Sequence, residues 1–134
     1  MSISDAAVPD ARTDFDRWIA AEYAAGDKRG FTAFVILLKI KKKDVQPLCS
    51  TYTHVIGTET DWGEVTTLLA GAGMSWDAVV FFAKRDFRNG GPLDNPAARL
   101  LLLDQEAKVR EDRLAINEGH FFDAWGRRMR VDEA

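Results

Sequence analysis

The last third of the chain carries two apolar seams that repeat with the same seven-residue spacing. The first seam consists of Leu100, Ala107, Leu114 and Phe121, and the second seam consists of Leu102, Val109 and Ile116. On a helix that advances by about 100° per residue, the two seams point about 180° apart. A helix on the surface of a domain needs only one apolar stripe to pack against its own core. The sequence therefore predicts a helix that is enclosed by its own fold, or one that offers its second seam to a partner.

The predicted helix is longer than a domain of this size is wide. A continuous helix from Pro96 to Trp125 would extend about 45 Å, whereas a compact domain of this size is very roughly 36 Å across. We therefore expect either that Gly119 breaks the helix or that another chain covers its projecting end. Two alternatives follow for the second seam: it packs against the first helix of the same chain, or it forms an interface with a second copy or another protein.

The rest of the sequence predicts a single α+β domain over residues 10–134, with the order αββαβα, after a flexible tail at 1–9. Helices are expected from Asp10 to Ala25, with Asp10 or Thr13 as the cap, and after Asp61, whose pairing with Glu64 resembles a capping box. Strands are expected over 31–40, 48–56 and 76–83. Residues 31–40 are apolar at both parities, which is typical of a strand buried on both faces. We predict a small, mainly antiparallel sheet of about three strands, three packed helices and a long C-terminal helix.

Charge and composition narrow the class of protein. The net charge of −3 argues against a dedicated nucleic-acid surface, although Lys39 to Lys43 and Arg127 to Arg130 form two basic clusters. No uninterrupted apolar run is longer than Ala33 to Leu38, which is far shorter than the ~20 residues of a membrane span. The single cysteine, Cys49, excludes an internal disulfide and fits a reducing compartment. We therefore expect a cytoplasmic protein that binds neither nucleic acid nor a membrane.

Candidate chemistry is sparse. Glu118, His120 and Asp123 are residue types used in metal and acid–base sites, but Glu118 and His120 lie about 200° apart on a helix. His120 and Asp123 have the spacing of a helical pair. Cys49 and His54 fall on opposite faces of the predicted second strand, so they do not form a nucleophile–base pair. The sequence predicts no catalytic residue, no metal site and no cofactor.

We therefore interpret the chain as a non-enzymatic protein-interaction or regulatory module that binds itself or another protein, most simply as a homodimer. The predicted interface residues are Leu102, Val109 and Ile116 of the second seam, together with Trp125 as an aromatic anchor. The alternative is a small enzyme or ligand-binding domain with a pocket between the sheet and the C-terminal helix. His54, Glu118 and His120 would supply the polar groups of that pocket.

Overall fold

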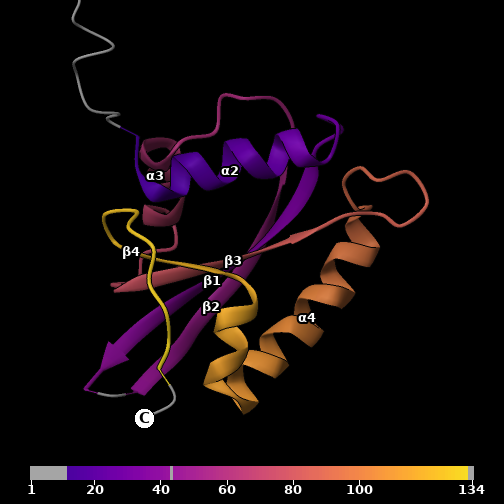
Figure 1. The fold of residues 1–134 in the computed structure, drawn as a ribbon. Coiled ribbons are helices and arrows are strands. Elements are labelled where there is room, and N and C mark those ends of the chain that lie inside the picture. Colours follow the sequence, from indigo (N-terminus) through magenta and orange to yellow (C-terminus); the bar gives the residue numbers. More distant parts are fainter. Residues whose placement is uncertain (1–11, 43, 133–134) are drawn as a thin grey trace, which may run out of the picture.

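The computed structural model describes residues 12–42 and 44–132 (Figure 1). Its elements in chain order are α2 (Asp14–Ala25), β1 (Phe31–Lys41), β2 (Asp44–Val55), α3 (Trp62–Ala70), β3 (Ala78–Lys84), α4 (Asn95–Glu111), the 3-10 helix η1 (Arg113–Glu118) and β4 (His120–Asp123). The predicted tail at 1–9 and the helix start predicted at Asp10 lie outside the described residues. α2 begins at Asp14, and Thr13 caps it by accepting a hydrogen bond from the backbone N–H of Asp16.

The four strands form one antiparallel sheet in the order β2-β1-β3-β4. β1 is central, and Val35 lies opposite Thr51 of β2 on one side and Phe81 of β3 on the other. The β1–β2 register shifts between Leu37 and Leu38, where β2 carries an irregularity next to Pro47. The predicted single α+β domain with an antiparallel sheet is confirmed, with four strands instead of the expected three or so.

Helices cover both faces of this sheet, with α2 and α3 on one face and α4 with η1 on the other (Figure 1). Residues 31–38 of β1 are all buried, which confirms the interpretation of this segment as a strand enclosed on both faces. Alternate residues enter different cores, because successive side chains in a strand point to opposite faces. Phe31, Ala33, Val35 and Leu37 enter the core under α2 and α3, whereas Phe34, Ile36 and Leu38 enter the core under α4.

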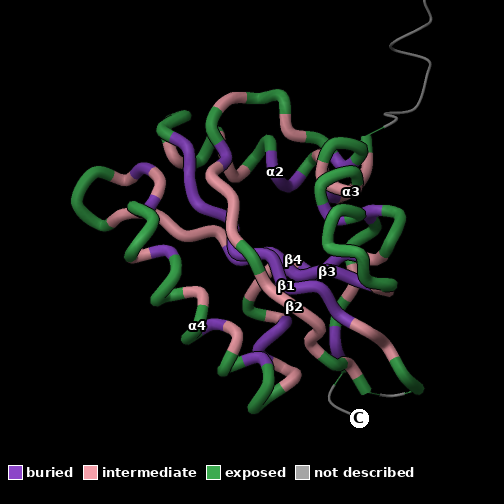
Figure 2. The backbone as a smooth tube through the Cα atoms, turned by 180° about the vertical axis from the view of Figure 1, so that it is seen from behind, coloured by how far each residue is buried: buried purple, intermediate pink, exposed green. Residues whose placement is uncertain are grey.

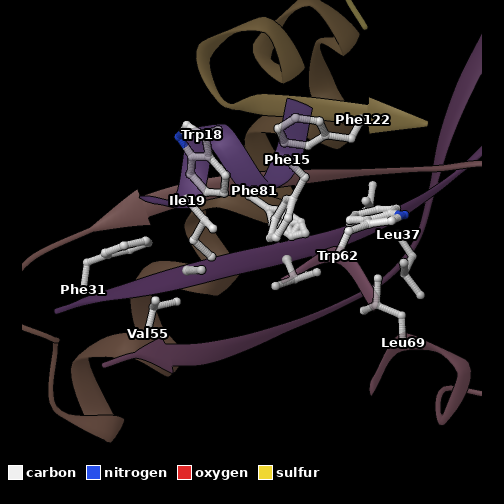
Figure 3. Close-up of a cluster of buried hydrophobic side chains, with 13 residues drawn as sticks. Phe15, Trp18, Ile19, Phe31, Leu37, Val55, Trp62, Leu69, Phe81 and Phe122 are labelled. Carbon is white, nitrogen blue, oxygen red and sulfur yellow. The ribbon is translucent and has the colours of Figure 1, made fainter. Parts of the chain in front are cut away.

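The core under α2 and α3 is built from large aromatic side chains (Figure 3). Phe15 of α2 lies 4.9 Å from Phe81 and 5.4 Å from Phe122, measured between ring centroids. Trp62, the first residue of α3, lies 5.2 Å from Phe15 in the same cluster. Aromatic pairs at these separations contribute beyond the area they bury. These contacts fix α2 and α3 on the sheet.

The predicted long C-terminal helix is confirmed as α4, but it ends at Glu111, before Gly119, and does not continue to Trp125. Asp112 adopts an extended backbone conformation, and its side chain accepts a hydrogen bond from the N–H of Leu114 at the start of η1. After η1 the chain passes Gly119 and enters β4. A Cβ atom at Gly119 would lie 2.7 Å from the carbonyl oxygen of Phe81, so only glycine allows this close approach. The seven-residue spacing of the seams therefore runs through three different elements instead of one helix.

The residues after β4 fold back along its free edge. Phe122 forms an isolated bridge with Arg128, and the N–H of Met129 donates to the carbonyl of Phe121 at 2.8 Å. The N–H of Arg128 donates to the Asp14 carboxylate at 2.9 Å, which ties this segment to the start of α2. In the described part of the chain, no helix has the length and apolar character needed to cross a membrane.

Candidate functional site

The structure places the second seam inside the fold. Val109 is 2% exposed on α4, and Ile116 is fully buried on η1. Both belong to the core beneath α4, and Leu102 packs against it while half-buried. The seam packs within the chain, but on the sheet and not against the first helix as expected, because α2 covers the other face of the sheet. Its predicted role as an interface would require the core to open.

The part of the first seam that lies on α4 is exposed to solvent, in contrast to the second seam. Leu100 is 67% exposed, Leu103 is 64% exposed, and Ala107 and Pro96 are also exposed. We call Pro96, Leu100, Leu103 and Ala107 the outer stripe. They follow the spacing of one helix face, and Figure 2 shows exposed residues along the side of α4 turned away from the sheet. The outer stripe is the largest group of exposed apolar residues on one described helix face.

Trp125 lies elsewhere on the molecule. It is 70% exposed in the turn after β4, and the Arg127 guanidinium lies 5.1 Å from the centre of its ring. The next residue, Gly126, accepts a hydrogen bond from the N–H of Phe15, so this turn lies at the start of α2. Trp125 is therefore accessible to a partner, but it does not extend the outer stripe.

The three residues of the predicted pocket are not brought together. His54 is on β2 and His120 is on β4, at opposite edges of the sheet. Three strand spacings, about 14 Å in total, separate these edges. The two side chains also lie on opposite faces, because His54 contacts Asn95 of α4 whereas His120 stacks on Trp18 of α2. Glu118 is exposed at the end of η1. These residues do not line a common pocket.

His54 belongs to a chain of hydrogen bonds that anchors the start of α4. Thr32, which is fully buried, accepts from the N–H of Leu93 at 2.9 Å, so its hydroxyl hydrogen is free to donate to Nδ1 of His54, also at 2.9 Å. Nε2 of His54 then carries the other hydrogen and donates to Oδ1 of Asn95 at 3.0 Å. The hydroxyl of Tyr52 donates to the same oxygen. This network ties the start of α4 to β1 and β2.

His120 is held by packing as well. Its ring stacks on Trp18 with centroids 4.5 Å apart, and Nδ1 lies 3.2 Å from a guanidinium nitrogen of Arg128. Burial and the positive charge of Arg128 lower the pKa of His120, against a smaller opposing effect of Glu22. The predicted pairing of His120 with Asp123 is not observed. Asp123 instead binds Arg127 at 2.7 Å, because β4 is a strand and residues three apart lie on opposite faces.

No catalytic or metal-binding arrangement emerges from these residues. Among residues 12–42 and 44–132, no group of three or more histidine, cysteine or acidic side chains could hold a metal ion. Cys49 is a half-buried thiol on the face of β2 opposite to His54, as predicted from the alternation along the strand. Of the first basic cluster, Lys39 and Lys41 lie in β1 and Lys42 follows it, while Lys43 lies outside the described residues. The second cluster, at 127–130, lies in the C-terminal segment after β4. No family model, curated protein or solved structure matches this chain.

One flank of α4 is fastened to β2. Glu106 accepts a hydrogen bond from the hydroxyl of Ser50 and pairs with Arg110 at 3.2 Å. The bond from Ser50 lowers the pKa of Glu106, burial opposes this shift, and Arg110 lowers the pKa further. Asn95 contacts Tyr52 and His54 of the same strand. The orientation of the outer stripe is therefore fixed by polar contacts as well as by the core.

The second seam, which the sequence predicts as the interface, is buried on α4 and η1, whereas Leu100 of the first seam is exposed. Leu103 belongs to neither seam. Four consecutive leucines at 100–103 point in all directions around a helix, so the sequence pattern does not indicate which of them is exposed. The flanking charges were the available signal. Asp104 and Glu111 project within about 40° of Leu100, whereas Ala98 and Gln105 flank the second seam. Charged neighbours mark the side of a helix that faces water.

Proposed function

We propose that this chain is a non-enzymatic protein-interaction module that self-associates through the outer stripe of α4. The observation that carries the proposal is the exposure of Leu100 and Leu103 on a helix whose opposite side is already buried. A leucine alone on a surface is ordinary, but apolar residues gathered on one helix face are typical of a contact site. The lone, unpaired cysteine supports action in the cytoplasm.

The polar residues favour this proposal over the alternative of an enzyme or ligand-binding domain. His54 and His120, the histidines of the predicted pocket, make packing contacts on opposite faces of the sheet. Groups that act together in catalysis must lie within hydrogen-bond reach of a shared substrate. The outer stripe needs no such convergence, because its recognition depends on apolar area and shape.

The test compares the molar mass of three proteins in solution. Light scattering after size-exclusion chromatography, at several protein concentrations, is applied to the wild type, to Leu100→Ser with Leu103→Ser, and to the control Met74→Ser with Phe87→Ser. The control removes exposed apolar side chains from two loops, outside α4 and β2. We expect a dimer for the wild type and the control, and a folded monomer for the α4 variant. One common mass for all three proteins would contradict the proposal.

A further inference from the structure

The two edge strands of the sheet, β2 and β4, differ in length and in whether another segment pairs with their outer edge. β4 spans 4 residues, and the C-terminal segment covers its edge through the bridge between Phe122 and Arg128. β2 spans 12 residues, and among the described residues β1 is the only strand that pairs with it. An unpaired strand edge presents backbone N–H and C=O groups that can accept another strand.

The part of β2 that is exposed in this way lacks the usual protective features. Proteins commonly protect an edge strand with charged residues, proline, bulges or a short length. In β2 the proline and the register shift occur at Pro47 and near Leu48, at the beginning of the strand. Residues 49–55 contain no charged residue, proline or glycine, and three of them are threonine or tyrosine at 51–53. Such residues favour strand pairing.

We propose that β2 pairs antiparallel with β2 of a second copy across a two-fold axis near Thr51, which joins the two sheets into one. This inference deepens the proposed self-association and rests on it, because it names the second copy as the partner and β2 as part of the contact. A two-fold axis at this position places each Thr51 opposite its own copy. Threonine pairs across strands are favourable, and no like charges meet within 49–53.

The position of α4 makes the same arrangement continuous with the outer stripe. A two-fold axis perpendicular to the joined sheet leaves both α4 helices on one face, side by side and antiparallel. Glu106 marks the flank of α4 that faces β2, through its bond to Ser50. Around the helix from Glu106 toward Leu100 come Arg99, Arg110 and Leu103, at about 20° intervals.

The charges on this flank suit pairing with a second copy. When the axis passes midway between Leu102 and Leu103, Arg99 lies opposite the partner's Glu106 and Glu106 lies opposite the partner's Arg99. Leu103 then lies close to the axis, where it meets apolar surface of the second copy. The strand and the helix therefore support one common two-fold axis by separate features.

The experiment introduces opposite charges at the axis. Thr51 is exposed in the single chain, so Thr51→Lys and Thr51→Glu should both fold as the wild type does. Like charges directly opposite one another disfavour strand pairing, whereas opposite charges favour it. We expect each variant alone to have a dimer dissociation constant at least about tenfold above that of the wild type, and an equal mixture to recover dimer. Thr58→Lys, exposed in the loop after β2, is the matched control.

Sedimentation velocity on the variants and on the mixture gives the readout. Recovery of dimer in the mixture supports the strand pairing, since a misfolded variant could not be rescued by its opposite charge. If both variants stay as dimeric as the control while the Leu100→Ser with Leu103→Ser variant becomes monomeric, self-association stands and the strand pairing is wrong. If the wild type itself remains monomeric, both proposals fail.

Discussion

The two sides of α4 are both apolar, yet the fold uses them differently. The side that carries Leu102 and Val109 packs on the sheet, whereas the side that carries Leu100 and Leu103 faces solvent. Periodicity does not distinguish these sides, because both repeat at helical spacing. The hydrogen bonds of Asn95 and Glu106 with β2 distinguish them, because these bonds fix which side of α4 faces the sheet. Apolar residues on one side of the helix therefore belong to the core, while those on the other side are exposed.

The strongest way to break this comparison is to place a charge on each side in turn. Val109→Asp should destabilise the chain by about 4 kcal/mol or more, because the carboxylate would be buried in an apolar core without a partner. Leu103→Asp should change the free energy of unfolding by less than about 0.5 kcal/mol. Urea denaturation of both variants measures the difference. A folded, fully stable Val109→Asp protein with a reduced mass would show that the second seam is the interface after all.

A smaller effect is expected where hydrogen bonds fix the start of α4. Thr32→Val keeps the shape of the side chain but leaves the N–H of Leu93 and Nδ1 of His54 without their partner. The expected loss is about 1–3 kcal/mol in the free energy of unfolding, the cost of leaving buried polar groups unpaired. Thr32→Ser, which retains the hydroxyl, is the matched control and should lose less. Equal losses in the two variants would mean that the methyl group, not the network, stabilises this end of the helix.

The smallest effect concerns acid. The folded chain holds the pKa of Glu106 below its ordinary value of 4.5, through the bond from Ser50 and the charge of Arg110. Its stabilisation is therefore complete above that value and declines as the pH falls through the lowered pKa. Glu106→Gln should flatten the fall in stability below about pH 4.5 and cost at most about 1 kcal/mol at pH 7. Chemical denaturation at pH 7 and below measures this, and parallel profiles for both proteins would contradict it.

Much of the fold could be predicted because its signals are local. Helix caps are predicted from a few neighbouring residues, and the structure confirms those at Thr13 and Asp61. It also confirms the strand at 31–40, which is apolar on both faces. The strand predicted at 48–56 leaves out residues 44–47 of β2, because Pro47 is typical of a strand boundary although it lies within the strand. β4 was missed because its four residues continue the spacing of the seams. A strand of four residues is too short to show an alternating apolar pattern, so its pairing with β3 is seen only in the structure.

The candidate site was less predictable, since it depends on which elements meet in space. His54 and His120 are suggestive residue types, but sheet order places them at opposite edges. The exposed edge of β2 could not be identified from the sequence either, because an edge strand is defined by the absence of a neighbour. The two seams themselves were real, and their assignment required the contacts of Glu106 and Asn95 with β2.

The most direct test of the central claim is sedimentation equilibrium of the wild-type chain over a wide range of protein concentrations. The outer stripe and the free edge of β2 predict a reversible equilibrium between monomer and dimer, with the dimer favoured as concentration rises. A mass equal to the 15.0 kDa of one chain at every concentration would contradict the account.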